Sequence, residues 1–178
     1  MDRRKKYTQQ VIQETLVELL KDRHLSDITV KEICEQADIN RSTFYRNYLD
    51  IYDLFEKVEQ ELSEQAFHNE DLFKSRNRLL EVIYDHQDFY SEFFHVGLES
   101  HQLNQMMKEL KSQTASILKK QGTYREETFE TEYQYNYYGV LGVVKKWVEN
   151  GCQKSPQELG KILYGIVDRQ YQNGTQPK

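Results

Sequence analysis

Turn-forming residues are scarce in this chain of 178 residues, which contains only two prolines and eight glycines. An all-β sandwich or barrel needs a turn signal after each short strand, so this scarcity favours long helices. Cysteine is also scarce, because Cys34 and Cys152 alone cannot form a disulfide framework. The longest uncharged apolar run, residues 137–144, is far too short to span a membrane, and no signal peptide follows the charged N-terminus. We therefore expect a reduced, cytoplasmic, helical protein with no membrane partner.

Charge alone does not identify a partner. The net charge is −5, but residues 1–50 hold nine basic and nine acidic side chains, so the acidic excess lies beyond them. The run Arg3-Arg4-Lys5-Lys6 is a local basic arm near the start of this balanced region. Because distribution matters more than total charge, a nucleic-acid partner remains compatible with the acidic sum.

Helical spacing of apolar residues extends along the chain and predicts about nine helices with no strand. Residues 8–22 form the first amphipathic pattern, and Asp50 is a cap for a longer helix that begins at about residue 51. Further on, Gly122 is suited to end a helix in the left-handed conformation, and Pro156 is suited to the first position of the last helix. The expected fold is all-α.

Two short helices are predicted between residues 29 and 48. Thr29-Val30-Lys31-Glu32 matches a capping box, and Asn40 is a good N-cap for a second helix over about 41–48. This second helix directs Phe44 and Tyr48 inward. Its outer face is rich in hydrogen-bond donors, namely Arg41, Ser42, Thr43, Tyr45 and Arg46. Such a pair fits a helix-turn-helix, whose second helix enters the DNA major groove, but spacing alone leaves a helical hairpin with an ordinary solvated face equally open.

The same region resembles a known family. The stretches 28–33 and 37–48, followed by Asp50 and Asp53-Leu54, resemble the N-terminal signature of TetR-type transcriptional regulators. The segments 139–147 and 155–159, with Gly151 between them, are similar to the C-terminal half of the branch that includes regulators of dihydroxyacetone-kinase type. The resemblance implies a three-helix DNA-binding head over residues 1–50, a connecting helix from about residue 51, and a regulatory and dimerisation body over 51–178. It also implies a homodimer that binds a pseudo-palindromic operator in double-stranded DNA.

Roles for individual residues follow from this resemblance. Thr29 and Tyr45 correspond to phosphate anchors, and base readers are expected at Arg41, Ser42 and Thr43. The family commonly has Lys just after the cap of its fourth helix, where this chain has Ile51. One phosphate anchor per subunit is therefore absent, and we expect the basic arm (residues 3–6) or Arg46 to compensate.

Two glycines point to close helix packing. An interior helical Gly costs ~1 kcal/mol relative to Ala, so Gly139 and Gly142, three residues apart, suggest that another helix approaches closely. In the family this region belongs to a dimer interface made by the last two long helices. Close packing within one subunit is the alternative.

No residue pattern supports catalysis. The five histidines and two cysteines form no His-x-x-x-His or Cys-x-x-Cys pair, and neither a phosphate-binding glycine loop nor a serine elbow is present. We therefore expect no enzymatic activity, no metal site and no cofactor. Asp88 and Glu92, four residues apart, are expected to be solvated surface charges.

A set of aromatic residues allows two interpretations. They either line an effector cavity, as in the family, or form ordinary core: Tyr84, Phe89, Tyr90, Phe93 and Phe94. The predicted function is a dimeric TetR-like regulator, controlled by a small-molecule effector or a partner protein on the body. The alternative is a helical ligand- or partner-binding module whose head does not read operator DNA. Nothing in the sequence distinguishes a repressor from an activator.

Overall fold

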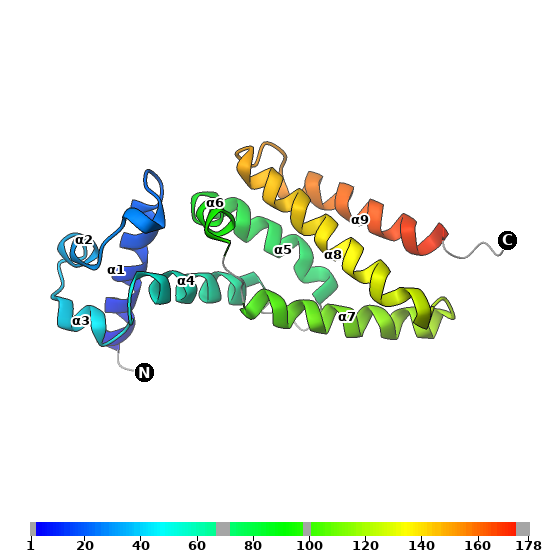
Figure 1. Ribbon diagram of the computed structural model, residues 1–178, viewed down its shortest axis with the longest axis horizontal. Helices are drawn as coiled ribbons and strands as arrows, with labels where there is room; N and C mark the ends of the chain where they lie inside the picture. Colours follow the sequence, from blue (N-terminus) through cyan, green and yellow to red (C-terminus); the bar gives the residue numbers. More distant parts are fainter. Residues whose placement is uncertain (1–2, 67–71, 98–100, 174–178) are drawn as a thin grey trace. The chain divides into compact units, whose positions relative to one another are not determined.

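The computed structural model describes residues 3–66, 72–97 and 101–173. Within these ranges the chain forms nine α-helices, one 3-10 turn and no strand, which confirms the all-α prediction (Figure 1). The chain divides into two compact units, Met1–Leu62 with Asp88–Ser100, and Ser63–Gln87 with His101–Lys178. None of the helices described is long and apolar enough to cross a membrane.

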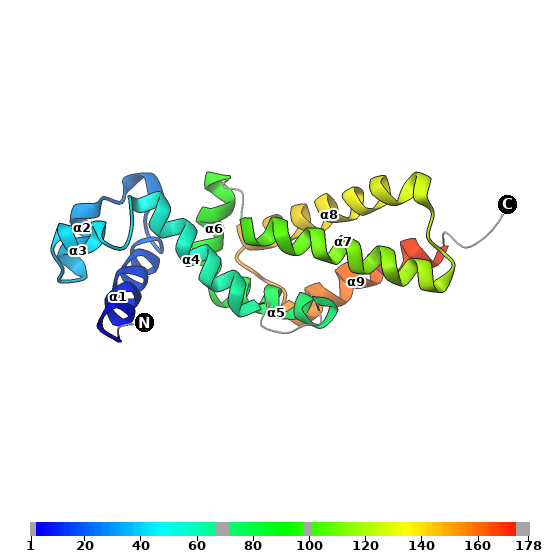
Figure 2. The same cartoon turned by 90° about the horizontal axis from the view of Figure 1, so that it is seen from below.

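The first unit contains the N-terminal helices and one later helix. Its elements are α1 (Arg3–Leu19), η1 (Leu25–Asp27), α2 (Val30–Gln36), α3 (Arg41–Tyr45), most of α4 (Ile51–Ala66) and α6 (Gln87–Val96). Helices α1, α2 and α3 are grouped together in both views (Figures 1 and 2). Their shared core includes the fully buried Ile12, Leu16 and Phe44. Helix α6 joins this unit because the Phe89 ring stacks on Phe55 of α4, with the ring centroids 4.4 Å apart.

The second unit consists of four helices and the end of α4. Its elements are α5 (Leu72–Asp85), α7 (His101–Gln121), α8 (Glu126–Glu149) and α9 (Pro156–Asn173). Helices α5 and α9 pack closely, since a Cβ at Gly160 would lie only 2.6 Å from Oδ1 of Asn77. Helices α7 and α8 are joined by the Tyr133 hydroxyl, which donates to the carbonyl of Met107 at 2.8 Å.

Several helix ends agree with the sequence prediction. Gly122 has a φ of +70° after α7, and Pro156 is the first residue of α9. Helix α1, however, begins at Arg3 and ends at Leu19, whereas the apolar pattern predicted 8–22. The basic arm is therefore the first turn of α1. Helix α3 also ends at Tyr45, earlier than predicted, although Phe44 and Tyr48 are both buried as expected.

Candidate nucleic-acid interface

The predicted capping box at the start of α2 is present. The Thr29 hydroxyl accepts the Glu32 amide at 3.3 Å, and a Glu32 carboxylate oxygen accepts the Thr29 amide at 2.9 Å. Arg23 donates to the other Glu32 oxygen at 2.8 Å. These hydrogen bonds, from Arg23 first and then from Thr29, lower the pKa of Glu32 to about 2. The start of α2 is thus fixed by a permanently charged carboxylate at ordinary pH.

The turn between α2 and α3 is short and tightly bonded. Ala37 is buried at the end of α2, where its amide donates to the carbonyl of Ile33 at 2.9 Å. Asp38 has a φ of +51°, a left-handed conformation that Asp tolerates better than most residues. The Ile39 amide then donates back to the Cys34 carbonyl at 3.0 Å. This geometry brings the two short helices together as a helix-turn-helix.

Asn40 organises the start of α3. Its side-chain oxygen accepts three hydrogen bonds: from the Thr43 amide at 2.8 Å, the Ser42 hydroxyl at 2.7 Å and the Thr43 hydroxyl at 2.9 Å. Because both hydroxyl hydrogens point to Asn40, the Ser42 oxygen can accept hydrogen bonds from outside, whereas the Thr43 oxygen already accepts one from Arg46 and has one lone pair left. The sequence predicted Asn40 only as a cap, and its hold on both hydroxyl groups was missed.

Most of the predicted DNA-binding residues lie on the surface. Arg41, Ser42, Tyr45 and Arg46 are exposed on the outer side of α3, opposite the buried Phe44, and Thr43 is half-buried. The structure therefore brings these five together on one short helix. Their contact with DNA stays a prediction, but their position is the one required of residues that enter a groove.

The two arginines of this face are not neutralised by carboxylates. Arg46 lies back along α3, where its guanidinium donates to the Ser42 carbonyl at 3.2 Å and the Thr43 hydroxyl at 3.0 Å. Within the described ranges, neither Arg41 nor Arg46 forms an ion pair. By contrast, Lys31 pairs with Glu35 at 3.7 Å, and Lys57 pairs with Asp53 at 2.9 Å. The positive charges of Arg41, at the start of α3, and Arg46, at its C-cap, therefore stay available to a phosphate backbone.

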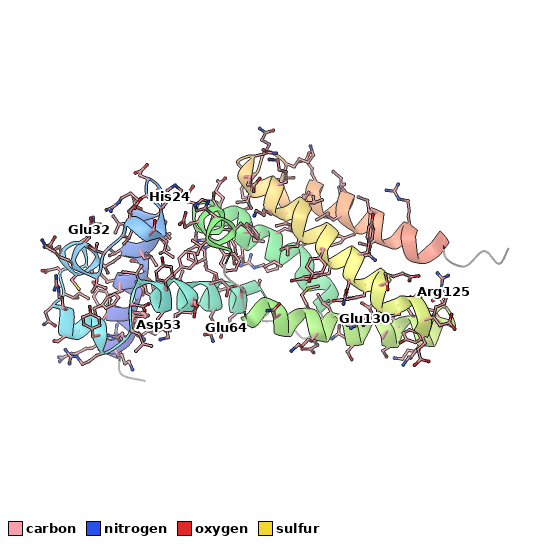
Figure 3. The ribbon with its side chains drawn as sticks, in the orientation of Figure 1. His24, Glu32, Asp53, Glu64, Arg125 and Glu130 are labelled. Atoms are coloured by element: carbon pink, nitrogen blue, oxygen red, sulfur yellow. The ribbon has the colours of Figure 1, made fainter. Side chains whose placement is uncertain are left out.

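Thr29 stands apart from this face. It is exposed, but its hydroxyl donates to a Glu32 oxygen at 2.7 Å. A phosphate contact through this hydroxyl requires the bond to Glu32 to be exchanged, so the anchoring role remains a prediction that carries this cost. Figure 3 labels Glu32 on α2 and His24 at the turn that precedes it.

Ile51, where the family resemblance predicted a missing phosphate anchor, is a buried residue. It begins α4 and is only 7% exposed. The predicted cap is formed just before it, because the Asp53 amide donates to the Asp50 carboxylate at 2.8 Å. The basic residues of the first α1 turn are exposed and have no acidic neighbour in that turn. A helix N-terminus is unfavourable for positive charge, so an external anion there would relieve a local repulsion.

The aromatic residues predicted for an effector pocket do not form one cluster. Phe89, Tyr90 and Phe93 are buried in the first unit, where Phe55 packs against two of them. Phe94 is half-buried beside them. Tyr84 belongs to the second unit and stacks on Trp147, with the ring centroids 6.2 Å apart. Packing within the protein accounts for this burial, and a pocket lined by these residues stays a prediction.

One buried charge contradicts the expectation from the sequence. Glu92, predicted as a solvated surface residue, is only 6% exposed and accepts hydrogen bonds from the first turn after α1. Its partners, His24 and Leu25, lie nearly seventy positions away in the sequence. No local pattern pointed to this contact, although Glu92 does lie on the aromatic side of α6 with Phe89 and Phe93.

Comparisons with known proteins agree with this arrangement. The TetR-type family model described as "Transcriptional regulator C-terminal region" matches residues 70–169. An uncharacterized HTH-type transcriptional regulator of Bacillus subtilis, YxbF, is 23% identical over 171 residues, which are 89% of this chain and 44% of YxbF. The chain therefore spans less than half the length of that relative.

Solved structures show the same fold. The dihydroxyacetone kinase operon activator DhaS has a TM-score of 0.68 at 17% identity, with 93% of this chain and 97% of DhaS covered. A TetR-family regulator from Syntrophomonas wolfei has a TM-score of 0.67 at 15% identity, with 93% and 95% covered. The family match extends over more than half of the chain and agrees with the helix-turn-helix at its start. The chain belongs to the TetR family of transcriptional regulators.

Proposed function

We propose that this regulator binds a pseudo-palindromic operator as a homodimer and reads the major groove with α3. Arg41, Ser42 and Thr43 contact base edges, while Tyr45 and Arg46 contact phosphates, with Thr29 as a further anchor. Residues 1–50 recognise DNA, and α4 connects them to the rest of the chain. Residues 51–178 form the dimer and respond to an effector or a partner protein.

The observation that carries this proposal is the outer face of α3. Two arginines without carboxylate partners lie there with two hydroxyls that Asn40 orients, and the face has no core to cover. Arg can bind guanine with two hydrogen bonds, and hydroxyl acceptors can receive the amino groups of adenine or cytosine. Three of the nearby acidic residues are paired with basic ones: Glu32 with Arg23, Glu35 with Lys31 and Asp53 with Lys57.

Dimerisation is supported by an exposed stripe on α8. Tyr135, Tyr138, Gly139, Gly142 and Val143 recur at helical spacing, and all five are exposed. A Cβ built at either glycine would meet no atom within 4 Å. A side chain at either position would therefore not clash within the protomer, which favours an interface over close packing inside one subunit. Helix α9 repeats the pattern with exposed Ile162 and Ile166 on either side of Gly165, which also faces open space.

A second copy of the chain is the occupant that fits these stripes. Small residues between larger apolar ones allow two helices to approach closely, and an operator of two half-sites requires a two-fold symmetric protein. Gly142→Leu should therefore shift the chain toward monomer in light scattering. Ser116→Leu, which adds the same side chain at an exposed position on α7, is the matched control and should stay dimeric. A dimeric Gly142→Leu variant would contradict this interface.

The direct test of function is selection of binding sites from a random duplex pool, followed by affinity measurements over a range of salt. We expect a two-fold symmetric motif whose affinity falls steeply with salt, because each phosphate contact releases counterions. No enrichment with purified dimer would contradict operator reading and favour the partner-binding alternative.

A further inference from the structure

Helix α6 is tied to the DNA-binding head by a buried carboxylate. Glu92 lies among the aromatic residues of α6 and is 6% exposed. One oxygen accepts the backbone amide of Leu25 at 2.8 Å, and the other lies 2.9 Å from Nδ1 of His24. The amide of Leu25 is the first of η1, so Glu92 caps this turn from a distant helix. A buried carboxylate is stable only with such partners.

His24 is the solvent-exposed partner of Glu92 in this contact. Its side chain is 62% exposed, and its ring stacks on that of His95, with the centroids 4.8 Å apart. His95 follows Glu92 by three residues, so both face the turn from one side of α6. Solvent can therefore exchange a proton with His24 while Glu92 remains buried.

The turn that Glu92 caps leads directly into the helix-turn-helix. Arg23, next to His24, donates to the carbonyl of Asp27 at the end of η1 and to Glu32 in α2. Glu32 in turn completes the capping box with Thr29. Hydrogen bonds therefore run without interruption from α6 through η1 to the start of α2.

We propose that Glu92 is a positioning residue for the DNA-binding head, and that protonation of His24 sets how firmly α6 holds η1. This inference rests on the proposed function, since it assigns to α6 a control over the helices that read DNA. With His24 charged, the contact is an ion pair and η1 is held firmly. With His24 neutral, the buried Glu92 carboxylate keeps its hydrogen bonds but loses the positive charge of the His24 ring. The contact between α6 and η1 is then weaker.

The surrounding charges favour the protonated form. The hydrogen bond to Glu92 is the largest cause that raises the pKa of His24. The negative charge of Glu92 raises it further, and that of Asp27 adds a smaller effect. The other ionisable groups nearby are Lys21, Asp22 and Arg23, which follow α1, and Asp88 and the stacked His95 on α6. Asp88 interacts with Lys21, and Arg23 is bonded to Glu32. Helix α4 packs on α6 through Phe55, and the buried Glu59 lies one helical turn after Phe55 on α4. Because the folded-state pKa is raised, the stabilisation is complete below about pH 6.5 and is lost as pH rises through the folded pKa.

The test compares the full chain with His24→Asn, in which the amide nitrogen keeps a donor near Glu92 but cannot titrate. Hydrogen exchange of the Leu25 amide, corrected for intrinsic rate, and operator affinity are measured between about pH 5.5 and 8.5, which brackets imidazole titration. In the wild type we expect Leu25 protection and affinity to fall severalfold together as His24 loses its proton. In His24→Asn both profiles should be flat, and the control His86→Asn should keep the wild-type profiles.

Glu92→Gln provides the second variant. It keeps an acceptor for Leu25 but removes the charge, so the pKa of His24, followed by its imidazole NMR signal, should fall from its wild-type value. Identical pH profiles in wild type and His24→Asn, or an unchanged His24 titration in Glu92→Gln, would overturn the proposal. Leu25 exchange and His24 titration need no DNA. Failure of the wild type to bind any duplex therefore refutes the proposed function, and these two measurements still decide whether the His24–Glu92 contact holds η1.

Discussion

Asn40 offers a sharp test of how the reading helix is built. Substitution to Ala removes the acceptor of three hydrogen bonds, one from the Thr43 amide and two from the hydroxyls of Ser42 and Thr43. Loss of an Asn N-cap costs ~0.5–2 kcal/mol in the free energy of unfolding. The two hydroxyls are at least partly accessible, so water replaces their lost partner and adds little. We therefore expect Asn40→Ala to destabilise the head by about 1 kcal/mol.

Thermal and urea unfolding of the full chain, followed by circular dichroism, measure this loss. For a chain of this length, 1 kcal/mol lowers Tm by roughly 2–4 °C. Asn40→Asp is the matched variant, because its carboxylate still caps α3 and is favourable at a helix N-terminus. Its stability should equal or exceed that of the wild type, while its operator affinity should fall because negative charge now lies beside the reading face.

The two variants refute different steps of the reasoning. Wild-type stability in Asn40→Ala would show that the three hydrogen bonds do not hold α3. Wild-type operator affinity in Asn40→Asp would show that the start of α3 lies away from the DNA, whatever the stability of the head.

Three further predictions concern the head. The pKa of Glu32 is lowered to about 2 from 4.5, so its stabilisation is complete above pH 4.5 and is lost as pH falls through 2. Glu32→Gln should therefore lose less stability than the wild type over this range, as acid denaturation curves of the two proteins can show, and equal losses would contradict this contribution. Deleting residues 1–6 should lower operator affinity and flatten its salt dependence, and an unchanged slope would exclude phosphate contacts there. Arg41→Ala should cost ~1–3 kcal/mol on the selected site and relax specificity, whereas equal loss on unrelated duplexes would make Arg41 a phosphate contact.

Local signals in the sequence predicted much of the head. The capping box at Thr29, the cap at Asn40 and the inward pair Phe44 and Tyr48 depend on residues within four positions of one another, so spacing was sufficient. The start of α1 was missed because residues 3–6 are all basic and carry no apolar periodicity. Their helical state depends on continuation of the backbone hydrogen bonds from the amphipathic turns that follow.

Contacts between distant segments could not be predicted in this way. In a sequence, a carboxylate such as Glu92 is ordinarily interpreted as a solvated charge. The contacts of Glu92 with Leu25 and His24 depend on the fold and are visible only in the structure. The aromatic residues predicted to line a pocket are divided between the two units for the same reason, because their contacts are with distant segments. Tyr84 and Phe89 are five residues apart, yet they pack on Trp147 and Phe55 in different units.

The exposed glycine and tyrosine stripe of α8 bears on how the regulator responds to its own abundance. If two copies must join along this stripe before two half-sites can be occupied, dimer concentration at low abundance rises with the square of protomer concentration. Operator occupancy then changes more steeply with synthesis and degradation than it would for a monomer.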